Sequence, residues 1–310
     1  MKKLGNPEIF DNDSECPETS WGKKFRNTRL VFRKQDGKLE FHTYLGDSRP
    51  ESFIYQIKRA DKDIGLDDFN YIRLYTTDNN PGYSMVESSP EPVFSQCQID
   101  ESSYCCKDFK SKQFHPGLII CPDYQFSSWL SFDYESYIKE VRKSALNKPS
   151  IRKVCWRGLA RPQHSNRALL CKMSNIHPDY IDAKHAGANK NKNDYLSMPE
   201  MISQYKYLID TQAHGFSGRL KYLMNSNRLI FMQDRFYKTF IEYDLKPFEH
   251  YIPVKYDFSD LIEKIKWGES HPEEAEAINN NMFEFASKNL SVDSINRKWK
   301  ELLNKPITFS

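Results

Sequence analysis

The sequence predicts an α/β protein of two domains, in which strands and helices alternate and helices close the C-terminal end. From residue 151 onward, short apolar runs with strand character alternate with segments of helical periodicity, a pattern typical of parallel α/β layers. From Ser259 to Leu303 the periodicity is helical throughout. A polar break at residues 147–150 divides the 310 residues into two parts, each long enough for its own core. We therefore expect an N-terminal domain over residues 1–148 and a C-terminal domain over residues 149–310.

The N-terminal domain is expected to be rich in strands. Alternating patterns on both sides of Asp36-Gly37 predict a β-hairpin over residues 30–44, because an Asp-Gly pair suits a tight hairpin turn. The other elements expected here are a strand or short helix at 53–59, strands at 71–75 and 117–121, and a helix at 134–146.

The C-terminal domain is expected to alternate between the two kinds of element. Ser165 is a good N-cap and predicts the start of a helix. Strands are expected at 151–156, near 180, and at 205–209, 229–232 and 250–254. Further helices are expected near 216 and at 236–242, 259–267, 273–288 and 292–303.

The composition limits the class of protein. Aromatic residues make up 14% of the chain and glycines number only 12, which excludes collagen-like and low-complexity chains. No run approaches the roughly 18 apolar residues that a membrane-spanning helix needs, so no membrane span is expected. The 45 basic and 42 acidic side chains nearly balance, which argues against nucleic acid as a partner. Residues 151–310 carry a net charge of +5 and residues 1–150 one of −2, so a phosphate-bearing ligand is expected in the second half.

The seven cysteines are irregularly spaced and include no C-x-x-C pair, so neither a zinc site nor a redox dithiol is predicted. Reduced thiols are expected, and a disulfide among Cys97, Cys105 and Cys106 remains an alternative if the protein is luminal. The lysines at the N-terminus are followed by no apolar stretch. We therefore expect a cytoplasmic protein, and a luminal one only if the sequence has been trimmed.

A glycine-rich segment, His214-Gly215-Phe216-Ser217-Gly218-Arg219, follows a predicted strand and opens a predicted helix. Its glycines allow a ligand to approach the backbone, the helix N-terminus offers N–H groups, and Arg219 adds a cation that can bind phosphate oxygens in a fork. The segment is therefore a candidate diphosphate cradle. The alternative is a turn with a surface arginine.

A second cationic constellation lies at another strand-to-helix junction of the same half. Trp156, Arg157 and Gly158 end a predicted strand, and Arg161 and Arg167 follow. Ligands of open α/β sheets bind at the carboxyl ends of strands, which favours ligand contact over the alternative of a solvated face.

Two features of the N-terminal half could serve an acceptor. Asp78 follows a predicted strand and could act as a general base, although a turn cap is the alternative. The segment from Pro122 places aromatic side chains beside hydroxyls and amides, which suits a sugar face. The alternative is an aromatic loop packed on the core. In the segment from Pro122, the candidate sugar contacts are Tyr124, Phe126, Ser127 and Trp129.

No metal site is predicted. Asp11-Asn-Asp13 matches the Asp-x-Asp pattern of metal-dependent sugar transferases, but it lies in an irregular segment. The eight histidines show no ligand spacing. The motifs of dehydrogenases, P-loop NTPases and α/β-hydrolases are absent from the sequence.

Four motifs in order, between about Val154 and Leu303, resemble those of the CAP10-like glycosyltransferases, glycosyltransferase family 90. That family includes protein O-glucosyltransferases, capsule xylosyltransferases and bacterial members linked to lipopolysaccharide. The motifs are Trp156-Arg-Gly with Arg167, Tyr205-Lys-Tyr-Leu-Ile-Asp210, Gly215-Phe-Ser-Gly-Arg219-Leu-Lys-Tyr-Leu, and Leu245-Lys-Pro-Phe-Glu-His-Tyr-Ile-Pro-Val254.

The resemblance implies a GT-B fold, in which two Rossmann-like domains face each other across a cleft. It implies an inverting transfer of xylose or glucose from a UDP-sugar to a hydroxyl of a glycan or glycoprotein acceptor, with no cofactor and no metal. Arg167, Ser217 and Arg219 match the residues that hold UDP, and Asp78 is the nearest match to the base. The alternative is an inactive glycan-binding or scaffold protein of the same fold.

The chain departs from the family pattern at three places, one of which is the loop from Arg157 to Arg167, which looks longer than in the glucosyltransferases and contains Pro162. Two residues rather than one separate Asp78 from Pro81. The family often has a glutamate where this chain has Thr239, which leaves the ribose contact open at that position.

Overall fold

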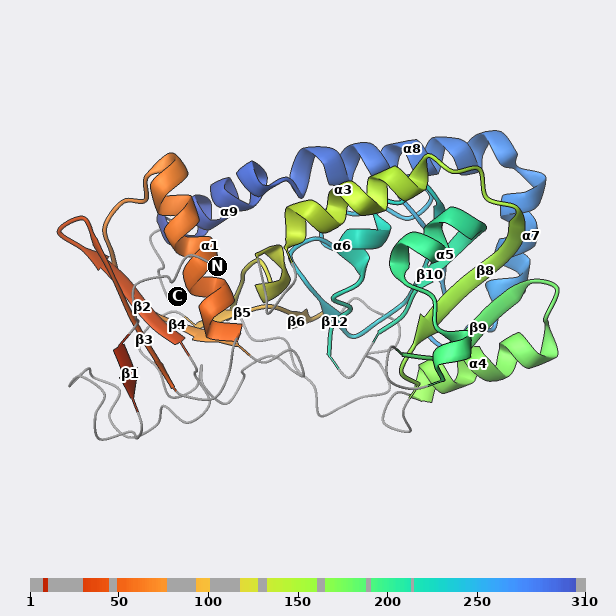
Figure 1. The fold of residues 1–310 in the computed structure, drawn as a ribbon, viewed down its shortest axis with the longest axis horizontal. Helices are drawn as coiled ribbons and strands as arrows, with labels where there is room; N and C mark the ends of the chain where they lie inside the picture. The colour runs from red at the N-terminus through yellow and green to blue at the C-terminus, as the bar shows by residue number, and fades with distance from the viewer. Residues whose placement is uncertain are drawn as a thin grey trace.

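A computed structural model gives the fold of the chain (Figure 1). It describes residues 8–10, 30–44, 49–76, 93–100, 118–127, 133–160, 165–187, 191–212 and 215–304. Within these ranges the strands form two main sheets, one in each half of the sequence, and a short two-stranded ribbon. The α/β class is therefore confirmed, and two separate main sheets agree with the GT-B expectation.

The N-terminal sheet has six strands in the order β1-β3-β2-β4-β5-β7. Its hairpin is confirmed: β2 and β3 pair antiparallel, and Asp36 and Gly37 turn between them with φ angles of 50° and 73°. The segment expected as a strand or short helix at 53–59 is part of a helix, α1 (Arg49–Ile64), which buries one apolar face. The strands are β1 (Glu8–Phe10), β2 (Leu30–Gln35), β3 (Lys38–Tyr44), β4 (Phe69–Tyr75), β5 (Val93–Ser95) and β7 (Leu118–Ile120).

The C-terminal sheet has five strands in the order β13-β11-β10-β8-β9, and all of its pairs are parallel. The predicted parallel layer is therefore confirmed. Parallel strands are buried on both faces, which explains the nearly continuous apolar runs of β10 and β11. The strands are β8 (Ile151–Gly158), β9 (Ile181–His185), β10 (Tyr205–Asp210), β11 (Leu229–Gln233) and β13 (Ile252–Val254).

Most of the predicted helices form close to their expected bounds. None of the described helices is long and apolar enough to cross a membrane. The remaining helical elements are η3 (Tyr124–Phe126), α3 (Tyr134–Ala145), α4 (Ser165–Ile176), η4 (Lys192–Asp194), α5 (Met198–Gln204), α6 (Leu220–Leu223), α7 (Leu261–Ser270), α8 (Pro272–Asn289) and α9 (Val292–Asn304).

Two helix predictions in the C-terminal half are wrong. The helix expected near residue 216 begins at Leu220 and is only four residues long. Instead of a helix at 236–242, the chain forms β12 (Tyr237–Lys238) and then turns. β12 pairs antiparallel with β6 (Gln98–Ile99) from the N-terminal half, so a contact distant in sequence overrides the local periodicity.

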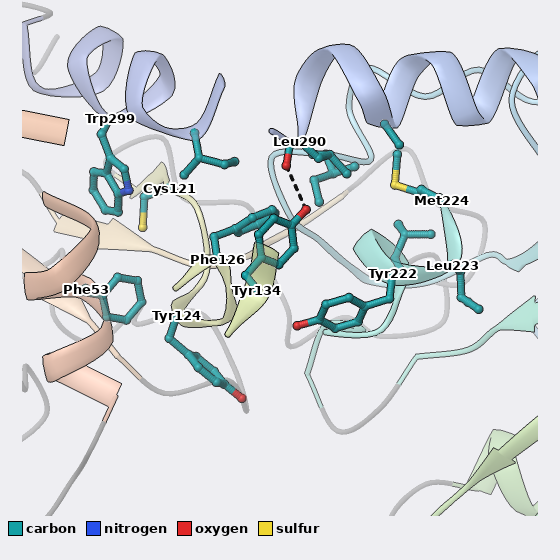
Figure 2. Close-up of a cluster of buried hydrophobic side chains, with 14 of the residues drawn as sticks. Phe53, Cys121, Tyr124, Phe126, Tyr134, Tyr222, Leu223, Met224, Leu290 and Trp299 are labelled. Carbon is teal, nitrogen blue, oxygen red and sulfur yellow. Dashed lines mark hydrogen bonds between the residues drawn. The ribbon is translucent and has the colours of Figure 1, made fainter. Parts of the chain in front are cut away.

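Helices link the two halves as well. α9 packs on α1, and its Trp299 is stacked with Phe94 and lies edge-on to Phe53, as Figure 2 shows in part. α3 packs on α5, and the Tyr134 hydroxyl donates to the Leu290 carbonyl. The predicted boundary at residue 148 lies between the two sheets, while α3 and α9 each pack against the half on the other side of it.

Candidate functional site

The side chain of Trp156 is the centre of the candidate site. It lies within a run of buried residues on β8, from Val154 to Arg157, and is 1% exposed. The guanidinium carbons of Arg167 and Arg219 each lie 5.6 Å from the centroid of its ring, within the range of a cation–π interaction. Gly158 allows this approach, because a Cβ there would lie 2.8 Å from Trp156 and 3.1 Å from the Arg219 guanidinium. The structure thus brings together the two cationic motifs that the sequence singled out.

The guanidinium of Arg219 makes no hydrogen bond or ion pair with the residues that the structure describes, and it lies over the Trp156 ring. Burial lowers the pKa of its guanidinium, although the charge of Asp210 works in the opposite direction. Asp210 itself is occupied by other partners, described below. Among the residues that the structure describes, no carboxylate therefore lies within hydrogen-bond distance of the Arg219 guanidinium.

Arg167 is equally poorly neutralised. Its two terminal nitrogens reach the carbonyls of Leu159 and Thr211 at 3.5 Å, the outer limit of a hydrogen bond. Its Nε is buried and has no partner among the described residues. Burial, followed by the positive charge of Arg219, lowers its pKa to about 10. Two cations that repel each other in a half-buried place would be stabilised by an anion, so anion binding by Arg167 and Arg219 stays a prediction.

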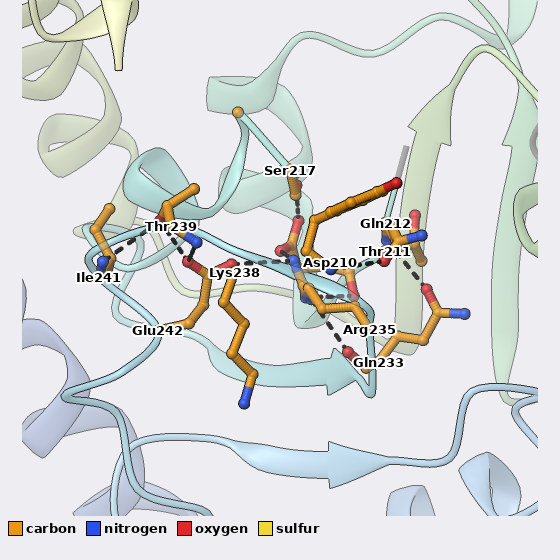
Figure 3. Close-up of polar contacts among 12 residues, drawn as sticks. Asp210, Thr211, Gln212, Ser217, Gln233, Arg235, Lys238, Thr239, Ile241 and Glu242 are labelled. Atoms are coloured by element: carbon orange, nitrogen blue, oxygen red, sulfur yellow. Dashed lines mark hydrogen bonds and ion pairs between the residues drawn. The ribbon is translucent and has the colours of Figure 1, made fainter. Parts of the chain in front are cut away.

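Ser217 is held by a buried ion pair (Figure 3). Its hydroxyl donates to Asp210 Oδ1 at 2.6 Å, and Arg235 Nη1 lies 2.7 Å from the other carboxylate oxygen. Asp210 and Arg235 are at most 2% exposed. With its proton donated to Asp210, the Ser217 oxygen keeps its lone pairs for another donor. Contact between Ser217 and a ligand stays a prediction.

The same network contains a carboxylate near Thr239. Glu242 Oε1 lies 3.6 Å from Arg235, and its Oε2 accepts from both the backbone N–H and the hydroxyl of Thr239. Burial raises the pKa of Glu242, while the charge of Arg235 opposes this. Burial alone would lower the pKa of Arg235, but the charges of Asp210 and Glu242 raise it. A carboxylate is thus present beside Thr239, three residues further along the chain than the family pattern places it.

Arg157, unlike Arg167 and Arg219, is paired with a carboxylate. Its Nη2 lies 2.9 Å from Asp182 Oδ2, and its Nη1 donates to the Asp182 carbonyl at 2.7 Å. Its Nε donates to the Asp194 carbonyl at 2.8 Å. All three nitrogens are engaged within the protein, so Arg157 ties β8 to β9 and η4, and we do not carry it into the proposed ligand site.

The predicted cradle at residues 214–219 differs from the expectation in its helix. α6 is too short for a macrodipole of useful size, so the N-terminal dipole does not contribute as predicted. Phe216 is buried, and it packs with Cys97 and Ile99 of the N-terminal half and with Phe236 and Tyr237. Ser217 is buried between Phe216 and Gly218 in the sequence. Ligand binding by this segment stays a prediction, and among its described residues Arg219 supplies the cation for it.

The aromatic segment near η3 forms part of the core, which is the alternative that the sequence left open. Phe126 is fully buried, with its ring 5.0 Å from that of Tyr134 and 5.8 Å from that of Phe240. Tyr124 is 5% exposed and Ser127 is 2% exposed. Figure 2 shows Phe126 and Tyr134 together in the apolar cluster. Phe126 and Ser127 therefore cannot present the exposed sugar-stacking surface that was expected.

Four of the predicted site residues lie outside the residues that the structure describes: Asp78, Trp129, Arg161 and His214. Their roles stay predictions. In the described part of the chain, no group of three or more histidine, cysteine or acidic side chains is placed to hold a metal ion.

The sequence reasoning missed two sets of buried charges beside the site. One is the pair Asp210–Arg235 with Glu242, and the other joins Lys221 to Asp123. The signal for each was a charged residue directly within or after an apolar run, at Leu208-Ile-Asp210 and at Leu220-Lys-Tyr-Leu. A charge in such a place needs a buried partner, and only the fold shows which one.

Comparison with known proteins identifies relatives of the chain. A family model described as Glycosyl transferase family 90 matches residues 78–306. Protein O-glucosyltransferase 2 of Danio rerio is 27% identical over 240 residues, which cover 71% of this chain and 43% of that protein. The O-glucosyltransferase LpsA of Dichelobacter nodosus is 31% identical over 141 residues, which cover 43% of this chain and 42% of that protein. The matches thus span less than half the length of these curated relatives.

Among solved structures, HepE of Anabaena in complex with UDP and glucose aligns with a TM-score of 0.44 and 10% identity. The alignment covers 76% of this chain and 71% of that one.

Proposed function

The chain belongs to glycosyltransferase family 90, and from this membership we propose that it transfers a sugar from a UDP-sugar to a hydroxyl of a glycan or protein acceptor. The family match covers both cationic motifs and the predicted base, Asp78. It also covers the whole of the C-terminal sheet. On this proposal the donor binds to the C-terminal half and the acceptor to the N-terminal half.

One observation carries the proposal: Arg167 and Arg219 share the Trp156 ring, and neither has a carboxylate partner among the described residues. Guanidinium groups match the geometry of phosphate oxygens and bind them in a fork. A UDP diphosphate would neutralise both cations and occupy the site at the carboxyl ends of β8 and β10, where ligands of parallel sheets bind.

The proposed reaction is an inverting displacement. Asp78 accepts the proton of the acceptor hydroxyl while that oxygen attacks the anomeric carbon, and the bond from this carbon to the UDP oxygen breaks on the opposite face. Arg167 and Arg219 stabilise the negative charge that builds up on the leaving diphosphate, so the reaction proceeds without a metal ion. One such preorganised group contributes roughly 3 kcal/mol in the transition state.

The first donor to test is UDP-glucose, because the two curated relatives described above are named as O-glucosyltransferases. UDP-xylose is the second, since xylose differs from glucose by a single hydroxymethyl group. Discrimination of that size arises from pocket shape and corresponds to roughly 1–3 kcal/mol.

The decisive experiment measures thermal stabilisation by UDP, UDP-glucose and UDP-xylose, together with release of UDP in the presence and absence of candidate acceptors. We expect UDP to raise the unfolding temperature and one UDP-sugar to be turned over. An inactive glycan-binding protein of the same fold would be stabilised by glycan and not by UDP. Absence of any UDP-dependent stabilisation or turnover would overturn the proposal.

A further inference from the structure

Lys221 is a buried cation that joins the Gly215–Arg219 segment to the N-terminal half. Its side chain lies on α6, two residues after Arg219, and is 1% exposed. Its Nζ lies 2.8 Å from Asp123 Oδ2, 2.8 Å from Gln125 Oε1 and 2.7 Å from the Gly218 carbonyl oxygen. These three acceptors match the three N–H donors of an ammonium group. One side chain therefore holds the backbone of the segment and two residues of the other half at the same time.

Gly218 and Gln125 fit together only because residue 218 has no side chain. A Cβ at position 218 would lie 2.6 Å from Gln125 Oε1 and 3.2 Å from Gln125 Cδ. Withdrawal of the Gln125 amide would break the hydrogen bond that its Oε1 accepts from Lys221 at 2.8 Å. Asp123 is itself only 2% exposed. The two halves are thus in tight contact at the residue that precedes Arg219.

These contacts bear on Arg219, whose guanidinium is fixed by no hydrogen bond to a described residue. Its orientation depends on the Trp156 ring and on the course of its own backbone. That backbone is set on one side by the bond between Lys221 and the Gly218 carbonyl. On the other side, Ser217 is held by Asp210.

We propose that Lys221 is a positioning residue of the donor site: it holds the Gly218 carbonyl against Asp123 and Gln125 and thereby aims Arg219 at the donor diphosphate. The inference rests on the function proposed above, since that function gives Arg219 its ligand. A misplacement of roughly 1 Å in a binding group lowers activity by as much as a hundredfold, so this aim matters as much as the charge.

The first test uses Gly218→Ala, which forces Gln125 or the segment to move. We expect UDP affinity, measured by calorimetry, to fall about tenfold to a hundredfold. Adding Gln125→Ala removes the clashing side chain and is expected to restore most of that loss. Gln125→Ala alone should cost less than Gly218→Ala, because Lys221 keeps its bonds to Asp123 and to the Gly218 carbonyl.

Gly268→Ala is the matched control for this test. A Cβ at position 268 would lie 2.9 Å from Leu229 Cδ2, so the variant creates a comparable clash away from the donor site, on α7. It is expected to lower the unfolding temperature and to leave UDP affinity unchanged. The proposal is wrong if Gly218→Ala folds and binds UDP as tightly as Gly268→Ala does.

The second test separates positioning from stability and does not depend on the folding of Gly218→Ala. The double variant Asp123→Asn/Lys221→Met removes both buried charges together, so no unpaired charge remains inside. The carbonyl of the new amide can still cap η3 as Asp123 does. We expect this variant to fold and to bind UDP about tenfold more weakly, the usual effect of losing a hydrogen bond made by a charged group. A folded double variant with wild-type UDP affinity would show that Lys221 serves stability alone.

The wild-type protein separates failure of this inference from failure of the proposed function. If the wild type does not bind UDP, the proposed function fails and the inference fails with it. If the wild type binds UDP and the variants bind as it does, only the positioning role of Lys221 is lost.

Discussion

At the scale of single residues, the main feature of the candidate site is that two arginines lie over one indole ring. Arg167 and Arg219 lie at the same distance from the Trp156 ring, and each is partly desolvated. Their charges repel each other, which costs free energy, and binding of an anion would reduce that cost. The same arrangement predicts which substitution weakens binding and which does not.

Arg219→Ala is expected to weaken UDP binding by about tenfold to a hundredfold, the range that follows from losing hydrogen bonds to a charged group. Calorimetric titration of UDP measures this directly. Arg33→Ala is the control, because Arg33 is paired with Glu40 on the N-terminal hairpin. Unchanged UDP affinity in Arg219→Ala would contradict the assignment of the diphosphate to this residue.

Asp78→Asn tests the proposed base. The variant should bind UDP as the wild type does, because Asp78 is assigned to the acceptor side. Its rate of transfer should fall by roughly a hundredfold to ten-thousandfold, the usual contribution of a general base. Sugar transfer to acceptor is the readout, and near-wild-type turnover would exclude Asp78 as the base.

The burial of Glu242 leads to a prediction about how the free energy of unfolding depends on pH. Burial raises its pKa above the ordinary 4.5, so the native state holds the proton more tightly than the unfolded chain does. This contributes stability that is fully present below pH 4.5 and is lost as pH rises through the raised pKa. Glu242→Gln removes that titration. The free energy of unfolding of the wild type minus that of the variant should therefore decrease as pH rises from 4.5, and a difference independent of pH would contradict this.

Among the helices and strands, local sequence pattern was sufficient to predict some elements and not others. The hairpin at 30–44 and the helices α3, α8 and α9 follow from turn chemistry and periodicity alone, because their amphipathic faces are long enough to dominate. Residues 236–242 have helical periodicity but form β12, because β6 offers a strand to pair with. The prediction of a longer helix from residue 216 is wrong for a similar reason. The contacts of Phe216 and Lys221 with the N-terminal half determine the path of the chain there.

The candidate site could be predicted from sequence only in part. Arg167 and Arg219 were found because each follows a strand and belongs to a recognisable motif. Their meeting at Trp156, and the occupation of Arg157 by Asp182, depend on side-chain directions that spacing does not reveal. The aromatic residues at 124–126 were ambiguous, because a core and a sugar platform use the same residue types.

α9 leads to a prediction at the scale of elements. Trp299 is fully buried between Phe53 and Phe94, and its Nε1 donates to Gln56 Oε1 at 3.0 Å. Trp299→Ala should therefore destabilise the protein by about 3–5 kcal/mol, the usual cost of truncating a buried tryptophan. Urea denaturation measures the change. Trp267→Ala, at a partly exposed position on α7, is the control and should cost clearly less.

At the scale of the whole molecule, the described elements cross repeatedly between the two halves. β6 pairs with β12, Lys221 pairs with Asp123, Tyr134 bonds to Leu290, and α9 covers α1. One cluster of buried apolar residues runs through both halves without a break. A second buried cluster lies wholly in the C-terminal half, around Trp156 and Phe231, but the shared cluster ties that half to the N-terminal one.

We expect a single unfolding transition for this reason. Thermal unfolding followed by far-UV circular dichroism and by tryptophan fluorescence should give one midpoint, and the calorimetric and van't Hoff enthalpies should agree. UDP should raise that midpoint without splitting it. Two resolved transitions, of which only one responds to UDP, would show instead that the halves unfold independently.

The position of Trp299 also has a consequence for biosynthesis. The N-terminal sheet and α1 leave the ribosome early, yet the indole that fills the space between Phe53 and Phe94 is made some 200 residues later. Until residue 299 emerges, that half has an unfilled core and an apolar face exposed to the cell. The nascent N-terminal half is thus expected to bind chaperones for most of translation, and to be released only when α9 docks.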